Sequence, residues 1–288
     1  MSNHGTGNKP SQTALNQMAP KLFNIEFYKL QLEINKYWRD SLAEQRYAKG
    51  KRLLRHGFKV YSQSDEDGII EEIFKRIGTD SRTFVEFGVQ RGVECNTTKL
   101  LLEGWRGLWL EGSADHVSAI EKTFRGLIEA ERLKCANAHV TRENINSLLS
   151  DNGMAGDIDL LSIDIDGNDY WVWEGIEAIR PRVVVIEYNA TLRPPLSVVV
   201  PYRPDWRWDG SNYFGCSLCA LCKLGKKKGY NLVGCGFSGA NAFFVRADLC
   251  GNKFHAPFTA EEHYEPPRYF FSTLSGGDRP GFGPFEAV

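Results

Sequence analysis

The chain has 288 residues, of which 42% are hydrophobic and 25% charged, and its formal net charge is −1. This size predicts one large globular domain with extensions, and the near-zero charge excludes a basic field that would attract nucleic acid or an anionic membrane. No apolar run approaches the roughly 20 residues that cross a bilayer, and seven cysteines without a small secreted scaffold suit a reducing compartment. We therefore expect a cytoplasmic protein with no nucleic-acid or membrane partner.

The N-terminal region divides into a polar tail and a helical extension. Residues 1–20 are polar, with scattered glycine, proline and asparagine, which predicts a disordered tail. Residues 21–58 are expected to form the extension, because apolar residues from Phe23 to Trp38 recur at helical spacing. Its helix would pack on the main domain or join two copies as a homodimer.

Residues 59–250 alternate between strands and helices and are expected to form the main domain. Ser64 followed by Asp67 resembles a capping box and predicts a first helix. Strands are then expected near 83–87, 107–111, 133–136, 158–164, 183–188, 230–235 and 241–246, and helices near 93–103, 114–131, 143–151, 169–179 and 214–228.

The strand sequences also predict how the sheet is built. Their continuous apolar character indicates a parallel sheet covered by helices on both faces. A link of only a few residues joins the last two strands, which is too short for a crossover helix, so that pair must be antiparallel. We predict an α/β, Rossmann-like fold with a seven-stranded, mostly parallel sheet and a C-terminal antiparallel strand pair.

A glycine turn after the first strand is the clearest sign of a ligand site. Gly88 and Gly92 follow that strand, and Glu111 ends the next one. Glycine lets the backbone approach a ligand closely, and an acid near this spacing meets ribose hydroxyls in doubly wound folds. The pattern predicts an adenosine-containing cofactor; a structural turn followed by an exposed acid is the alternative.

Polar residues also follow the fourth and fifth strands. Asp164 and Asp166 come after one strand, and Glu187 and Asn189 after the other. Since the carboxyl ends of parallel strands meet at one edge of a sheet, these side chains should converge there. Three interpretations remain open: a divalent ion such as Mg²⁺ or Mn²⁺, a metal-free site with Asp166 or a histidine as general base, and a structural turn with a helix N-cap at 166–169.

Two further segments have distinctive compositions. The loop 190–212 is long, and loops of this length inside compact domains are usually functional lids. Residues 251–288 are expected to be irregular. The lid residues expected to cover an acceptor are Trp206, Trp208, Asp209 and Tyr213.

Three cysteines, Cys216, Cys219 and Cys222, recur at a spacing of three residues. A structural zinc site usually needs a fourth ligand. Cysteine is also a common small buried residue, so we expect these side chains to pack in the core.

Three segments resemble a known family. VEFGVQRGVECNTTKLLLEGWRGLWLEGS, DIDLLSIDIDGNDYWVWEGI and VVVIEYNA are similar to the class I S-adenosylmethionine-dependent methyltransferases, specifically the FkbM-like group, over roughly residues 60–250. The resemblance implies methyl transfer from S-adenosyl-L-methionine, usually to an oxygen of a sugar, a glycan or a secondary metabolite.

The resemblance also implies a role for individual positions. It places Gln90 where the family's turn usually has its central glycine, so the Gln90 side chain would itself bond the ligand. It places Asp164 beneath the transferable methyl, with Asp164 and Asp166 as the catalytic pair. The cofactor residues it implies are Glu86, Gly88, Gln90 and Gly92 around the methionine part, Glu111 at the ribose, Asn137 and Ala138 beside the adenine, and also Gly112 and Asp164. If a divalent ion binds at the strand ends, its ligands would be Asp164, Glu187 and Asn189, although Tyr188 separates the last two.

The leading hypothesis is therefore an O-methyltransferase for a small-molecule or carbohydrate acceptor. One alternative is a glycosyltransferase, since Asp164-Ile165-Asp166 is formally a D-x-D motif. Another is a catalytically silent protein that keeps the methyltransferase fold and acts as a binding partner.

Overall fold

The computed structural model describes residues 12–269 and 278–288, with side chains from residue 24 onward in those ranges. The chain forms two compact units, Met1–Ala48 and Lys49–Val288.

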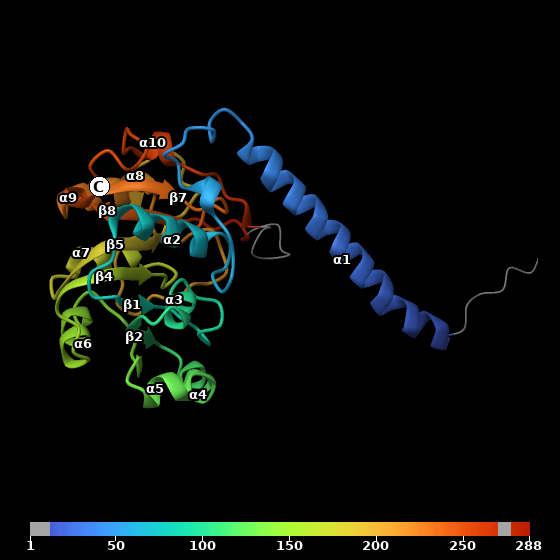
Figure 1. Cartoon of the computed structure of the whole chain (residues 1–288), viewed down its shortest axis with the longest axis horizontal. Helices are drawn as coiled ribbons and strands as arrows, with labels where there is room; N and C mark the ends of the chain where they lie inside the picture. Colours follow the sequence, from blue (N-terminus) through green and yellow to red (C-terminus); the bar gives the residue numbers. More distant parts are fainter. Residues whose placement is uncertain (1–11, 270–277) are drawn as a thin grey trace, which may run out of the picture. The chain divides into compact units, whose positions relative to one another are not determined.

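The first unit consists mainly of one long helix, α1, which spans Gln12–Leu42 (Figure 1). The helix begins well before residue 21, so the predicted disordered tail is wrong for residues 12–20, where alanine, leucine, methionine and glutamine favour a helix. Residues 1–11 lie outside the described part of the chain. Large apolar side chains along α1 are exposed, among them Tyr28 at 67% and Leu32 at 68%.

The second unit is built on a seven-stranded sheet. Every neighbouring pair is parallel except the two that involve β8, which runs antiparallel to both β5 and β7. This arrangement confirms the predicted Rossmann-like sheet. In spatial order the strands are β3 (Leu133–Asn137), β2 (Arg106–Glu111), β1 (Thr83–Phe87), β4 (Gly156–Ile163), β5 (Ile179–Glu187), β8 (Asn241–Arg246) and β7 (Tyr230–Cys235).

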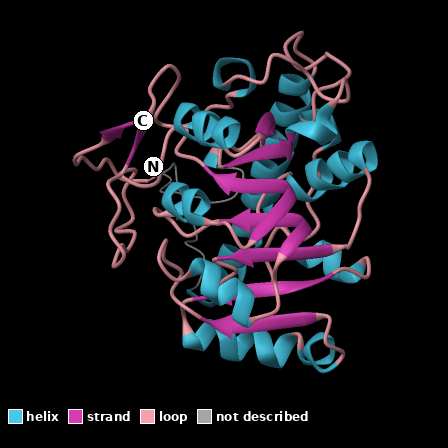
Figure 2. Cartoon of the chain, turned by 90° about the vertical axis from the view of Figure 1, so that its left-hand side faces the viewer, coloured by secondary structure: helices cyan, strands magenta, loops and turns pink. Residues whose placement is uncertain are grey.

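Helices cover both faces of this sheet, as predicted (Figures 1 and 2). Apolar side chains of α6, α7 and α8 pack with one set of strand residues, including Val85 and Phe87, in one continuous core. Among the described residues, none of the helices combines the length and apolar character that a membrane crossing needs. The helices are α2 (Glu66–Ile77), α3 (Thr98–Leu102), α4 (Ala114–Thr123), α5 (Arg125–Glu129), α6 (Ile145–Asp151), α7 (Asp169–Gly175), α8 (Leu218–Lys227), α9 (Ala247–Cys250) and α10 (Ala260–His263), with a short 3₁₀ helix, η1, at Leu54–His56.

Several predicted helices are shorter than expected. The helix predicted at 93–103 begins only at Thr98, and the one predicted at 114–131 is divided at Phe124. Helix α7 ends at Gly175, and β5 begins at Ile179 within the predicted helix. The apolar periodicity of the sequence predicts longer helices because it continues into residues that lie in loops or in the next strand.

The predicted capping box at Ser64 and Asp67 is wrong. Asp67 Oδ2 instead accepts hydrogen bonds from the backbone N–H groups of residues 60–62, at 2.7, 2.7 and 2.8 Å. Ser64 Oγ is buried and has no hydrogen-bond partner among the described residues. The acid at this position therefore fixes the preceding loop, not the end of the helix.

The C-terminal segment is more regular than predicted. It contains α10, and strand β9 (Glu286–Ala287) pairs with β6 (Val198–Val199) of the lid loop. Cys216 and Cys219 lie in the large core and Cys222 packs against it, so these cysteines do pack as expected.

This C-terminal segment contains a buried histidine. His263 is 3% exposed, and its Nε2 lies 3.1 Å from the carbonyl oxygen of His255. Burial, and then the nearby charges of Arg52 and His255, lower the pKa of His263 to about 4, against smaller opposing effects of the hydrogen bond with the His255 backbone and of Glu262.

We expect this histidine to make folding stability depend on pH. Between about pH 6.5 and 4 the unfolded chain takes up a proton that folded His263 does not, so stability falls as the pH falls through this window, by about 3 kcal/mol at most. Urea unfolding of His263→Gln should show a flatter pH dependence than the parent. His139→Gln, at an exposed position, is the control; equal slopes for all three proteins would contradict the assignment.

Candidate functional site

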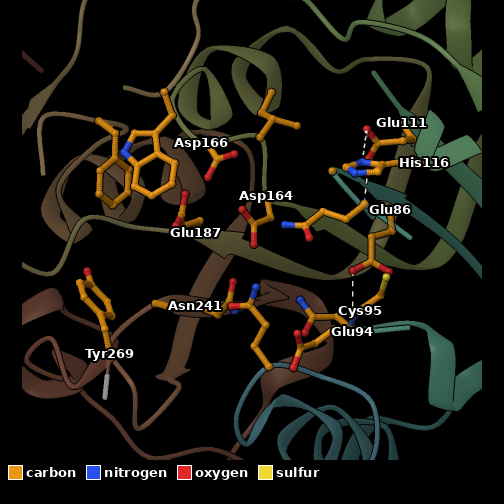
Figure 3. A pocket seen from close by; sticks show the side chains of 18 of the residues that line it. Glu86, Glu94, Cys95, Glu111, His116, Asp164, Asp166, Glu187, Asn241 and Tyr269 are labelled. Carbon is orange, nitrogen blue, oxygen red and sulfur yellow. Dashed lines mark hydrogen bonds and ion pairs between the residues drawn. The ribbon is translucent and has the colours of Figure 1, made fainter. Parts of the chain in front are cut away.

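The main cavity of the protein lies where the carboxyl ends of the parallel strands meet. Its volume is about 550 Å³ (Figure 3). Its lining is rich in carboxylates and, among the described residues, includes His116 but no lysine or arginine. The lining residues from the predicted set are Glu86, Gly88, Gln90, Glu111, Asp164, Asp166, Glu187 and Trp208.

Glu86, in β1, is a buried carboxylate that organises the loop before α3. Its Oε1 accepts hydrogen bonds from Asn96 N at 2.9 Å and Ser162 Oγ at 3.1 Å, and its Oε2 accepts from Thr97 N and Oγ1. Burial raises the pKa of Glu86, and these hydrogen bonds oppose that rise. The residue therefore shapes the cavity wall.

The two glycines of the turn have different roles. Gly88 lines the cavity with φ +74°, and a Cβ there would lie 1.7 Å from the carbonyl oxygen of Asp164. Gly92 is not among the lining residues, and a Cβ there would meet the rings of Trp109 and Phe124. Gly92 is thus required by packing.

Glu111, the last residue of β2, faces the cavity and is 7% exposed. Its Oε2 accepts a hydrogen bond from Gln90 N at 2.8 Å, and its Oε1 accepts one from Ser113 N at 2.8 Å. His116 Nδ1 lies 3.4 Å from the same Oε1 (Figure 3). Gln90 has φ +48°, the left-handed conformation that a glycine would adopt easily. The Glu111 carboxylate therefore fixes the turn at Gln90 and also faces the cavity.

A second cavity of about 270 Å³ continues from the first and shares Gly88, Glu111 and Asp166 with it. Gly112 and Ala138 line this second cavity, as the adenine and ribose positions would require. Asn137 does not line either cavity, and its Nδ2 donates to the carbonyl oxygen of Glu111 at 2.9 Å. Asn137 therefore fixes the end of β2.

Three carboxylates converge at the ends of β4 and β5. Asp164, Asp166 and Glu187 each offer an oxygen, and these oxygens all lie within 4.8 Å of one another. Glu187 Oε2 is buried and accepts no hydrogen bond from a described residue. Close acidic oxygens, with no lysine or arginine among the described residues of the lining, form a donor set that suits a hard divalent cation.

Burial and mutual repulsion favour the neutral forms of these acids. Burial raises the pKa of Asp164 well above its usual range, and the charges of Asp166 and Asp169 raise it further. Glu187 has a pKa raised in the same way, by burial and then by Asp164. Partial burial, with Asp278 and Glu111 nearby, raises the pKa of Asp166.

The turn after β4 combines two of the predicted interpretations. Asp166 has φ +57° and contributes its carboxylate to the acidic cluster. Asp169 instead accepts hydrogen bonds from Ile165 N at 2.9 Å and Gly167 N at 2.8 Å, and burial raises its pKa to about 6. Asn168, the N-cap residue of α7, makes no side-chain capping hydrogen bond. Asp169 is therefore the structural acid of this turn.

Asn189 is not part of the acidic cluster, so the structure contradicts its predicted role as a metal ligand. Its Oδ1 accepts hydrogen bonds from Thr191 N and Oγ1, and its Nδ2 donates to the carbonyl oxygens of Asn212 and Phe214 at 2.8 and 3.0 Å. All its polar atoms are thus used to join the two ends of the lid loop.

The lid loop covers the site through its tryptophans. Trp206 lines the second cavity, where its Nε1 donates to the carbonyl oxygen of Asp166 at 2.8 Å, and Trp208 lines both cavities. Asp209 and Tyr213 do not line either cavity. Asp209 pairs with Arg279 at 3.0 Å, and the hydroxyl of Tyr213 donates to the carbonyl oxygen of Pro284 in the C-terminal segment.

The cavity also contains residues that the sequence did not single out. Among them, Asn241 begins strand β8, and the antiparallel pairing of β8 with β5 places it beside the end of β5. The others lie on loops and helix starts for which no strand pattern gives a position. The unpredicted lining residues are Gln63, Glu94, Cys95, Asn96, His116, Ile165, Phe214, Ala240, Asn241, Tyr269 and Asp278.

Comparison with known proteins gives similar structures only. No protein-family model and no curated protein matches the chain. Similar solved structures include an O-methyltransferase from Bacillus cereus in complex with SAH, at 16% identity and TM-score 0.35, covering 56% of this chain and 76% of that one.

A second is a S-adenosylmethionine-dependent methyltransferase from Clostridium acetobutylicum ATCC 824, at 12% identity and TM-score 0.39, covering 74% of this chain and 98% of that one. A third is the N-terminal domain of EvdMO1 in the presence of SAH and D-fucose, at 13% identity and TM-score 0.40, covering 75% of this chain and 94% of that one. Identities and TM-scores this low carry no argument about function. The fold of this chain is defined by its own strand order.

The acidic cluster predicts an unusual response to charge removal. Glu187→Gln removes one of three converging carboxylates, so in EDTA at pH 8 it should stabilise the protein by about 1 kcal/mol or more against urea, because like charges this close repel. Glu261→Gln, at an exposed position, is the control and should change little. Destabilisation by Glu187→Gln alone would show that Glu187 has a favourable partner.

Proposed function

We propose that the protein is an S-adenosylmethionine-dependent O-methyltransferase that acts on a hydroxyl of a small, sugar-like acceptor. One observation carries the proposal: the turn at Gly88, the ribose-type acid Glu111 and the acidic cluster around Asp164 all line one cavity at the carboxyl edge of the sheet. Open α/β sheets bind their ligands at this edge.

The electrostatics of the cavity agree with this cofactor. S-adenosylmethionine supplies an electrophilic methyl group on a positively charged sulfur, and its amino-acid end carries an ammonium group. A cavity lined by several carboxylates, and by no described lysine or arginine, favours such a cation. Glu111 lies at the junction of both cavities, where its carboxylate can accept the ribose hydroxyls.

The acidic cluster would hold the acceptor through a divalent cation. Asp164 and Glu187 supply two negative oxygens, and the unpaired, buried Oε2 of Glu187 is a ligand atom that needs a partner. Mg²⁺ or Mn²⁺ bound there would orient the acceptor hydroxyl and lower its pKa.

Asp166 is then the general base for this hydroxyl. It is the most exposed member of the acidic cluster, and partial burial raises its pKa, which makes it a stronger base than an ordinary aspartate. As the acceptor oxygen forms its bond to the methyl carbon, the carbon–sulfur bond breaks with its electron pair on sulfur, and the hydroxyl proton passes to Asp166. The lid residues Trp206 and Trp208 would limit access of water from above.

The cofactor assignment predicts the effect of removing Glu111. We expect Glu111→Ala to weaken binding of S-adenosylhomocysteine at least about tenfold, measured by calorimetry, because two charge-assisted hydrogen bonds to the ribose are lost. Asn137→Ala, which alters a neighbouring residue outside both cavities, is the matched control and should retain most of the affinity. Unchanged affinity in Glu111→Ala would remove Glu111 from the cofactor site.

The chemical assignment predicts separate effects on binding and turnover. Asp166→Asn should keep S-adenosylhomocysteine affinity but lower turnover roughly 10²–10⁴-fold, as expected for loss of a general base. Turnover would be measured as S-adenosylhomocysteine release with a panel of monosaccharides that includes D-fucose. EDTA should abolish the same activity and added Mn²⁺ should restore it; full activity in EDTA would refute the cation.

A further inference from the structure

A buried amide beside the acidic cluster has an unused acceptor atom. Asn241, the first residue of β8, lines the main cavity and is only 3% exposed. Its Oδ1 is buried and has no hydrogen-bond partner among the described residues. Buried polar atoms are nearly always paired, so an unpaired one inside a ligand cavity indicates a partner that binds there.

The sheet brings this amide next to Glu187. Asn241 and Glu187 are directly opposite each other in the antiparallel pairing of β5 and β8. Side chains opposite each other in such a pair project to the same face, with their Cβ atoms about 4.5–5.5 Å apart. Figure 3 shows Asn241 in the same cavity as Glu187 and Asp164.

The orientation of the amide is set by a second buried acid. Asn241 Nδ2 donates to Glu66 Oε1 at 3.1 Å, and Glu66 Oε2 accepts from Ser64 N at 2.8 Å. Because both carboxylate oxygens of Glu66 act as acceptors, the amide must turn its NH₂ group toward Glu66. The unpaired Oδ1 of Asn241 is then kept away from Glu66 and available to a ligand.

We propose that Asn241 is a protein ligand of the divalent cation, through Oδ1, and that Glu66 is the positioning residue that holds the amide in this orientation. The inference rests on the proposed cation site and completes it. Asp164 and Glu187 balance the two positive charges, and a neutral amide oxygen adds a hard donor without further repulsion. Asn241 thus takes the amide role that the sequence had suggested for Asn189.

The test is Mn²⁺ affinity, measured from the free-ion electron paramagnetic resonance signal without substrate or turnover. We expect Asn241→Ala to bind Mn²⁺ at least about tenfold more weakly than the parent, equivalent to about 1.4 kcal/mol. Asn241→Asp should bind at least as tightly as the parent, because it keeps an oxygen at the ligand position. Asn96→Ala removes another buried amide that lines the same cavity and should leave Mn²⁺ affinity unchanged.

A purely structural role for Asn241 gives the opposite result for the aspartate variant. If its only task is to donate to Glu66, an ionised aspartate fails as badly as alanine, and equal losses in both variants would overturn the inference. Equal affinity of Asn241→Ala and the parent would overturn it as well, while the proposed cation site would stand.

Two further measurements separate this inference from the proposed function. Calorimetry of the parent with S-adenosylhomocysteine tests the cofactor site alone, and a parent that binds this ligand but no Mn²⁺ would overturn both the cation and the role of Asn241. If a variant does not fold, a crystal of the parent soaked in Mn²⁺ decides the question by anomalous scattering. Asn241 Oδ1 at about 2.0–2.6 Å from the ion supports the inference, and an oxygen beyond direct contact overturns it.

Discussion

The repulsion between carboxylates at the edge of the sheet is the constraint on which the site depends. The fold holds oxygens of Asp164, Asp166 and Glu187 within 4.8 Å of one another. Such an arrangement is unfavourable for the protein alone, because burial and like charge both oppose ionisation. In the proposed site, a positive charge in the cavity would relieve this repulsion, so the arrangement that costs stability would also create affinity for cationic ligands.

Hydrogen bonds hold the backbone around these repelling carboxylates in place. Asp169 accepts two backbone hydrogen bonds within the turn that presents Asp166, and Trp206 donates to the carbonyl oxygen of Asp166 from the lid. Glu86 fixes the loop before α3 with a similar set of buried hydrogen bonds. The acids that face the cavity are therefore held in place by other acids, whose own carboxylate oxygens accept hydrogen bonds from the protein.

Acids that fix the backbone and acids that face the cavity thus occur close together, and their positions in the sequence do not distinguish them. Glu86 and Asp169 have both carboxylate oxygens engaged by backbone N–H groups, whereas Glu187 has an oxygen without a partner among the described residues. The spacing of Ser64 and Asp67 predicts a capping box, but the chain before the helix folds back so that Ser62 N donates to the Asp67 carboxylate. Which acid faces a ligand is decided by the path of the loops.

The sequence by itself determined the sheet and the strand-end acids. Continuous apolar strands and a short final link predict a mostly parallel sheet with an antiparallel last pair, and Glu111, Asp164 and Glu187 follow because parallel strands end at one edge. Only the tertiary structure decided the functions of Gly92, Asn137 and Asn189, which serve packing and loop closure, and brought Asn241 and Asp278 to the cavity. The physical reason is that strand periodicity is a local property, whereas the side chain that faces a cavity depends on loop contacts between residues far apart in the chain.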